Sequence, residues 1–429
     1  MQLKRTNGAF FCTLIIYIYL MLRLSALIPL CLFFISCVWD ETDDIPDYLP
    51  LDDSEYPYAD LPRIVIETEN FAQIRNRETE IPAKIQVYKN AAPESGIMDI
   101  KIRGRGNSSF GAPKYSYKIK FNSSTRFLDF PKGKSWDLIS NYIDKSLIRN
   151  HISFKLANLL KTSYAPRSTF VELFLNRQYM GVFLLTEHVT VSKNRVNIPP
   201  VESSFLFEME PPENDGNLYI STKIGSSFRI HYPENQDNPY IDSLISFLDD
   251  WENYLYYSSK KEQMDKWFDF DEYIKYYWIQ EFSKNNDAAY TRSIYFTWQK
   301  NGIIKMGPVW DFDVAYGNKP QKTMQESENW HIRENGWNKP FFSDGSLKKR
   351  VSDFWKKNRN AFVDILDSID IYSAQIKKAA QNEYKRWNIQ DVTIYGNASH
   401  PYKSHQESVD SLKTWINRRI LWIDKNYDY

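Results

Sequence analysis

Cysteine is almost absent from this sequence of 429 residues, because the only three are Cys12, Cys31 and Cys37. A disulfide scaffold and a cysteine-ligated zinc site are therefore excluded for the long remainder of the chain. Glycine is also scarce, at 15 residues, which excludes collagen-like and glycine-rich linker architectures. An excess of one charge is missing too, since 54 basic residues balance 54 acidic ones. A general nucleic-acid binder needs a basic excess against phosphate, so we expect no nucleic-acid partner.

Aromatic residues are abundant by contrast. The sequence contains 29 Tyr, 26 Phe and 13 Trp, which together make up 16 % of the chain. Disordered chains are poor in aromatics and carry excess charge of one sign. The composition therefore predicts a folded protein with a large aromatic core.

The first 36 residues have the character of an export signal. They contain three basic residues and no acidic one, and they end in a 12-residue apolar run at 24–35. This run is long enough for a signal peptide but short for a membrane span, which needs about 20 apolar residues. Ser36 and Cys37 follow the run, and this arrangement resembles a bacterial lipobox. We expect residues 1–36 to be a lipoprotein-type signal peptide, with Met21 as an alternative true start.

The resemblance to a lipobox implies that Cys37 becomes the lipidated first residue of the mature protein. The alternative is an uncleaved N-terminal anchor that starts at Met1. Residues 37–61 have no basic residue and many Asp and Glu, and such a stretch buries too little apolar surface to fold alone. We interpret 37–61 as an acidic tether, which also resembles the surface-export signals of Bacteroidetes lipoproteins. The expected location is a lipid anchor on the outer membrane or cell surface, or in the periplasm.

The folded body is expected to span 62–429, with strands in its first half and helices in its second. Apolar residues alternate with polar ones around 98–103 and 115–121, and a period of two marks half-buried strands. Asp144 and Asp271 stand where helix N-caps are expected. The fold class is therefore α+β, in two lobes. Further strands are predicted at 83–89, 169–175, 181–187 and 205–210, and further helices at 347–366, 373–387 and 407–426.

Three aspartates stand around a predicted hairpin. Asp287 precedes the strand 293–298, and Asp311 and Asp313 follow the strand 303–306. The intervening Asn301-Gly302 fits a type I′ turn, because both residues tolerate positive φ. The hairpin would bring the three carboxylates together, where they repel one another unless a cation lies among them. Oxygen ligands of this kind suit Mg²⁺.

A second group of residues is basic. Gly104 and Gly106 allow a sharp turn or a close approach of the backbone to a ligand. Four cationic side chains surround them on predicted strands, and such side chains can bind a polyphosphate. The simpler interpretation is a basic sheet face exposed to solvent. The four residues are Arg103, Arg105, Lys118 and Lys120.

The layout from Asp287 to Asp313 resembles the parts of a protein kinase, in which a catalytic-loop Asp precedes a hairpin that leads to Asp-Phe-Gly. Here Asp-Phe-Asp takes that place. Several segments together resemble the successive blocks of the CotH family, which is named for a bacterial spore-coat protein kinase with an atypical kinase-like fold. These segments are 103–109, 118–121, 136–150, 176–187, 307–313 and 415–422.

The resemblance implies an ATP-dependent phosphotransferase that requires Mg²⁺ or Mn²⁺ and acts on Ser or Thr of an unidentified protein. Asp287 would orient or deprotonate the acceptor hydroxyl, and Asp311, with Asp313, would hold the metal. Lys118 or Lys120 would contact the phosphates, and Glu187 would position that lysine. One departure is that kinases place Asn five residues after the catalytic Asp, where this chain has Arg292, followed by Ser293, whose hydroxyl offers another ligand.

Two functional hypotheses remain open from the sequence. The first is a kinase-like phosphotransferase held outside the cytoplasmic membrane through Cys37. The second is a non-catalytic surface lipoprotein that binds glycan or protein through aromatic side chains, which suit both kinds of partner. The best loop for such a partner is the segment 325–342, which contains four large aromatic residues amid polar ones.

Overall fold

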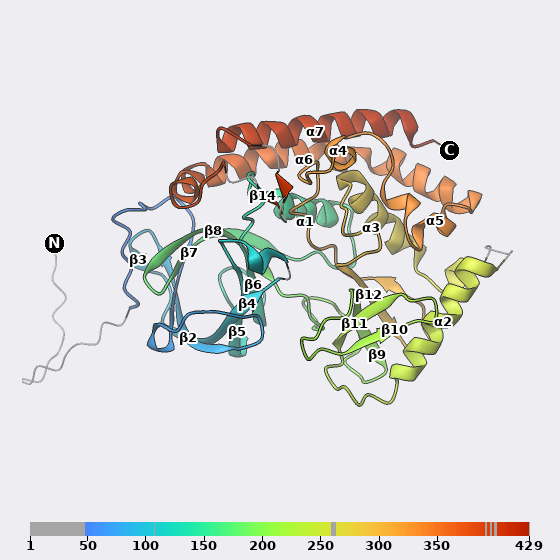
Figure 1. Ribbon diagram of the computed structural model, residues 1–429, viewed down its shortest axis with the longest axis horizontal. Helices are drawn as coiled ribbons and strands as arrows, with labels where there is room; N and C mark the ends of the chain where they lie inside the picture. The colour runs from blue at the N-terminus through green and yellow to red at the C-terminus, as the bar shows by residue number, and fades with distance from the viewer. Residues whose placement is uncertain are drawn as a thin grey trace, which may run out of the picture. The chain divides into compact units, whose positions relative to one another are not determined.

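The computed structural model describes residues 48–106, 108–258, 263–390, 393–394, 397–398 and 401–428 (Figure 1). Residues from Tyr48 onward form one compact unit. The signal peptide, the lipidation site at Cys37 and the first part of the acidic tether lie outside the described residues, so those predictions stay predictions.

The first half of this unit is a closed β-barrel. Its strands are hydrogen-bonded in the order β1-β7-β8-β6-β5-β4-β2, and β2 also pairs with β1, which closes the ring. All neighbours are antiparallel except β1 and β7, which are parallel. A short strand, β3 (Ala92–Pro93), extends β2 at the edge. The barrel strands are β1 (Arg63–Thr68), β2 (Ile81–Lys89), β4 (Met98–Arg105), β5 (Ser116–Thr125), β6 (Gly133–Ile139), β7 (Ser168–Leu175) and β8 (Gln178–Glu187).

The predicted alternation of apolar and polar residues separates the side chains of the barrel strands into an inner and an outer set. Ile100 and Ile102 on β4 and Ile119 on β5 are buried in the barrel core, which also contains Trp136. Their sequence neighbours point to the other side, as side chains on a strand must. The cationic side chains of β4 and β5 therefore share the outer face of the barrel.

A second, five-stranded sheet follows in the order β10-β11-β9-β12-β13. Its central strand β9 pairs antiparallel with both β11 and β12. In Figure 1 the helix α2 lies beside this sheet. The elements are β9 (Ser204–Met209), β10 (Tyr219–Ser221), β11 (Ser227–Tyr232), β12 (Ile294–Gln299), β13 (Lys305–Met306) and α2 (Ile241–Tyr257).

The remaining helices pack around a core shared with the second sheet. The helices α6 and α7 run side by side along one edge of the structure, and α6 contacts β8 of the barrel as well as α1 and α3 (Figure 1). The helices are α1 (Arg149–Leu159), α3 (Phe270–Ser283), α4 (Lys322–Gln325), α5 (Asn338–Phe341), α6 (Gly345–Arg386) and α7 (His405–Asn426). Short 3-10 turns lie at Glu69–Phe71, Ser108–Gly111, Met264–Lys266 and Ile332–Glu334, and a two-stranded pair joins β14 (Thr393–Ile394) to β15 (Asn397–Ala398).

Several local predictions differ from the structure. The two helices expected at 347–366 and 373–387 form one helix of 42 residues, because the buried stripe continues from Ile365 through Ile369 to Ile376. The N-cap of α3 is Asp269, whose side chain accepts from the Glu272 N–H, rather than Asp271. Polar residues at both positions made the sequence ambiguous there.

The domain also begins earlier than the predicted boundary at residue 62. Leu49, Ala59 and Leu61 are buried, although all three lie in the expected acidic tether. Asp53 forms an ion pair of 2.5 Å with Arg63 of β1. The described part of the acidic segment, 48–61, therefore packs on the folded body, because its few apolar residues find partners there.

The α+β class is confirmed by a strand-rich first half and a helical second half. Closure of the first sheet into a barrel was not predicted, because strand patterns do not reveal which edges pair. Within the described ranges, no helix combines the length and apolarity needed to cross a membrane.

Candidate active site

One cavity collects most of the predicted site residues. It has a volume of about 750 Å³ and is lined by strands β4 and β5 of the barrel, by the second sheet, and by the loops around the hairpin β12–β13. All four cationic residues and all three aspartates line it, although the sequence placed these two groups on different elements. The residues concerned are Arg103, Arg105, Lys118, Lys120, Asp287, Asp311 and Asp313.

The hairpin brings the aspartates together as predicted. Lys284 ends α3 in the left-handed conformation, with φ 46°, and Asp287 follows in the loop. Asn285 Nδ2 donates to the Asp311 carbonyl oxygen at 2.9 Å, which joins the loop before β12 to the loop after β13. The turn itself differs from the prediction. Only Asn301 has a positive φ, of 66°, so the connection is not of type I′.

Burial and mutual repulsion raise the pKa values of two of these aspartates. Burial, and next the negative charge of Asp287, raise the pKa of Asp311 to about 6, against the opposing pull of Arg105. Burial and the neighbouring Asp311 raise the pKa of Asp313 well above its usual value. Asp313 Oδ1 is buried and has no hydrogen-bond partner among the described residues. A cation bound among these carboxylates would relieve their repulsion.

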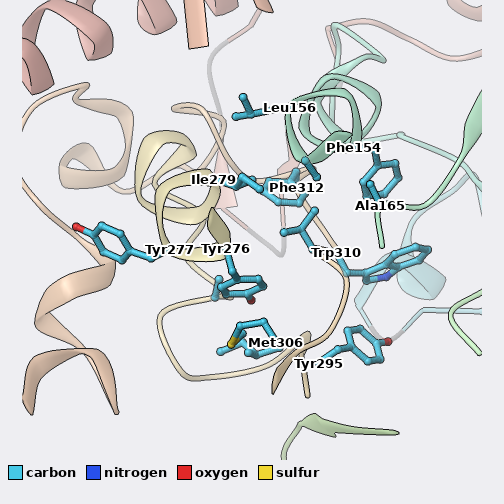
Figure 2. Packing of buried hydrophobic residues seen from close by; sticks show 14 of the residues in the cluster. Phe154, Leu156, Ala165, Tyr276, Tyr277, Ile279, Tyr295, Met306, Trp310 and Phe312 are labelled. Carbon is cyan, nitrogen blue, oxygen red and sulfur yellow. The ribbon is translucent and has the colours of Figure 1, made fainter. Parts of the chain in front are cut away.

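Packing of apolar side chains fixes the backbone of the segment that contains Asp311 and Asp313. Figure 2 shows Trp310 and Phe312 among buried residues, where Phe312 lies toward α1 and α3. Phe312 is fully buried, and its N–H donates to Asn150 Oδ1 at 2.8 Å. Asp311 lies between these two anchors with φ 63°, a conformation that few residues other than Gly, Asn and Asp adopt readily. The apolar side chains therefore hold the two carboxylates on the cavity side.

The cationic side of the cavity contains a hydrogen-bonded chain that sequence reasoning missed. Lys118 Nζ lies 2.9 Å from His188 Nε2, and His188 Nδ1 lies 2.9 Å from Asp137 Oδ2. Arg105 Nε is 3.3 Å from Asp137 Oδ1, and its guanidinium lies over the ring of Trp310 at 5.3 Å. Burial lowers the pKa of Lys118 to about 8, and it lowers that of His188 to about 3.

Lys120 and Arg103 contact other groups than Lys118 does. Lys120 lies 3.5 Å from Glu80 and is 41 % exposed, so it stands nearer the rim than Lys118. Arg103 donates to the carbonyl oxygen of Gly104 at 3.0 Å. Gly104 itself is required by packing, because a Cβ there would lie 2.2 Å from a ring carbon of Phe110. Of the two lysines, Lys118 is therefore better placed for a ligand inside the cavity.

Glu187 does not have the predicted role. It is fully buried, and its carboxylate accepts from Arg167 Nη1 at 2.9 Å and from the Tyr164 hydroxyl at 3.1 Å. It does not contact Lys118, whose partner is His188. Glu187 is one position from His188, the residue that bonds the lysine, and side chains of neighbouring residues in extended backbone point to opposite faces.

The second sheet adds acidic residues that the sequence did not indicate. Glu208 Oε2 lies 2.6 Å from His231 Nε2. Burial, and next the charge of Glu208, raise the pKa of Glu210 to about 7, although Arg292 opposes this. The Ser293 hydroxyl lies 3.5 Å from Asp311 Oδ2, so it is near the candidate metal ligands as expected.

The segment 325–342 is not an exposed aromatic loop. Trp337, Phe341 and Phe342 are buried in the main core, and Trp330 packs against Trp422 with ring centroids 4.7 Å apart. The aromatic residues there stabilise the fold, which removes the loop that the glycan-binding or protein-binding hypothesis favoured.

The residues present fit a metal–polyphosphate ligand. Among the residues with described positions, no group of three or more His, Cys, Asp or Glu side chains is arranged to hold an ion by itself. Mg²⁺ is, however, commonly held by one or two carboxylates together with substrate phosphates. Asp311 and Asp313 would supply the carboxylates, and Lys118 and Arg105, which line the same cavity, would supply cations for the phosphates.

The cavity between the barrel and the second sheet thus has both cationic side chains and carboxylates on its walls. Nucleotide-dependent phosphotransferases use the same combination of charges. The family model described as CotH kinase protein matches residues 100–423, and the chain belongs to this family. No curated protein matches the chain significantly.

Proposed function

We propose that this protein is an ATP- and divalent-metal-dependent phosphotransferase with a two-lobed, kinase-like arrangement, which acts on hydroxyl groups of a protein acceptor. Membership of the CotH kinase family supports kinase-like activity in general. The observation that carries the specific proposal is the cavity that Arg105 and Lys118 line together with Asp287, Asp311 and Asp313.

Different residues of the cavity have different proposed roles. Asp311 and Asp313 would hold Mg²⁺ or Mn²⁺, and Lys118, Arg105 and Arg103 would hold the phosphates. The metal–nucleotide complex, when bound, supplies the transferable phosphoryl group and neutralises its charge. Electrostatic preorganisation of this kind is usually the largest contribution to catalysis, because the charges already lie where they are needed.

Asp287 would orient the acceptor hydroxyl and take its proton. The loop that carries it is fixed by its own backbone, because the Thr291 hydroxyl and the Arg292 N–H donate to the Asp287 carbonyl oxygen at 2.8 and 3.2 Å. Asn286 Nδ2 lies 3.4 Å from Asp287 Oδ1. These contacts leave the carboxylate at the cavity wall, where an acceptor side chain can reach it.

The proposed location is outside the cytoplasmic membrane, through a lipid on Cys37. Replacement of Cys37 by Ser should move the protein from the membrane fraction to the soluble fraction while nucleotide binding is retained. Retention of the variant in the membrane fraction would contradict the lipid anchor.

Incubation of the purified protein with γ-labelled ATP and Mg²⁺ or Mn²⁺ tests the activity, with generic protein acceptors and the protein itself as targets. We expect label on Ser or Thr, and we expect Asp287→Asn to reduce the rate by at least about 100-fold, as general-base removal typically does. Asp99→Asn is a matched control, because Asp99 is 69 % exposed and pairs only with Lys84 on the surface. Equal labelling by the Asp287 and Asp99 variants would exclude the catalytic assignment.

A further inference from the structure

We propose that His188 is a positioning residue, which separates Lys118 from Asp137 and so keeps the lysine available for the phosphates. This inference rests on the proposed function and names a residue of the same site. Lys118 and Asp137 are directly opposite each other in the pairing of β5 with β6. Side chains in such a pair approach closely, and opposite charges would then form a direct ion pair.

The imidazole of His188 prevents that direct contact. It lies between the two groups, 2.9 Å from Lys118 Nζ on one side and 2.9 Å from Asp137 Oδ2 on the other. An ammonium group can only donate hydrogen bonds, so Nε2 of His188 must be the acceptor. The proton of the neutral ring is then on Nδ1, which donates to the Asp137 carboxylate. The geometry thus selects one tautomer.

The consequence is a lysine whose charge is not cancelled by a contact ion pair. Its hydrogen bond to His188 uses one N–H, and two N–H groups remain for a ligand. Besides Asp137, the charged groups that act most strongly on Lys118 are Arg103 and Arg105 from β4 and Lys120 from β5, which are cationic. Asp137 is kept ionised, because Arg105 and His188 hold its pKa below the usual range although burial alone would raise it.

Removal of the imidazole should let Lys118 collapse onto Asp137. The variant His188→Ala is therefore expected to weaken binding of inorganic tripolyphosphate in the presence of Mg²⁺ by about tenfold, measured by isothermal titration calorimetry. In an Asp137→Asn background no carboxylate remains to capture the lysine. There the same His188→Ala change should weaken binding by less than about threefold.

A merely structural role of His188 predicts another pattern. The loss would then be the same in both backgrounds, or it would follow the thermal midpoint of each variant. His405→Gln is a matched control, since His405 bonds the Ser146 carbonyl oxygen on a different element. We expect that variant to bind tripolyphosphate as the wild-type protein does.

Nitrogen NMR of the imidazole tests the same inference without a ligand. We expect the signal that disappears in His188→Ala to show a neutral ring protonated on Nδ1 between pH 5 and pH 8. A ring protonated on Nε2, or equal losses in the two backgrounds, would overturn the proposal, as would a wild-type protein that does not bind tripolyphosphate. If tripolyphosphate binds but no phosphoryl transfer from ATP occurs, only the proposed function fails.

Discussion

Replacement of Asp311 by Asn is expected to stabilise this protein when no divalent cation is present. Asp311 is buried beside two other carboxylates, and burial together with Asp287 raises its pKa from 3.8 to about 6. The folded state therefore binds a proton more tightly than the unfolded state does. Ionisation of this group at neutral pH costs folding free energy, and the neutral amide avoids that cost.

The expected magnitude follows from the shift in pKa. A difference of about two pH units corresponds to about 3 kcal/mol, with 1.36 kcal/mol for each unit. For a chain of this size that is about 4 °C in thermal midpoint. The penalty is absent well below pH 3.8, where the carboxyl is protonated in both states, grows between pH 3.8 and about 6, and is constant above that. Asn also tolerates the positive φ of this position, so little backbone strain is added.

Thermal unfolding of the two proteins in EDTA, followed by circular dichroism, measures the effect. At pH 7.5 the Asn variant should unfold at the higher temperature, whereas at pH 4 the two midpoints should nearly coincide. The exposed Asp99→Asn change should alter neither midpoint. A variant that is less stable than the wild-type protein at pH 7.5 would refute the claim that these carboxylates repel one another.

Three further predictions concern the surroundings of the site. Lys114→Met should destabilise the protein by about 3–5 kcal/mol in urea unfolding, because it leaves Glu383, now 2.8 Å from Lys114 Nζ, as an unpaired buried charge. Glu187→Gln should lower the free energy of unfolding by about 2 kcal/mol, because it weakens the contacts with Arg167. It should leave the Kd for Mg-ATP unchanged, and an altered Kd would show that Glu187 does act in the site. Mg-ATP affinity should fall as the pH rises above about 8, where Lys118 loses its charge. An affinity that does not fall between pH 8 and pH 9.5 would exclude this lysine.

Much of the fold was predictable from local pattern. The alternation of Ile100 and Ile102 with charged residues correctly predicted β4, and the strands predicted at 169–175 and 181–187 correspond to β7 and β8. Barrel closure was not predictable, because the pairing of β1 with both β2 and β7 depends on long-range contacts that no local pattern contains. The continuity of α6 was missed because two buried positions near its centre, Ser368 and Ser373, are polar and interrupt the apolar pattern.

The acidic half of the site was predictable because a hairpin is a local structure. Two residues that flank a hairpin must approach each other, so Asp287 and Asp311 could be paired from sequence alone. The partner of Lys118 could not be predicted from the sequence, because His188 comes near it only through the pairing of β5 with β6 and of β6 with β8. The cavity that joins both halves depends on the packing of the barrel against the second sheet, and only the three-dimensional structure shows it.

The most direct test of the account is the thermal shift caused by Mg-ATP. We predict that Mg-ATP raises the midpoint of the wild-type protein by several degrees at pH 7.5, because a ligand that binds only the folded state stabilises it. Mg²⁺ alone should do so less, since the site needs phosphates to complete the coordination. The shift should disappear in Asp311→Asn. An unchanged midpoint of the wild-type protein at millimolar Mg-ATP would contradict the central claim.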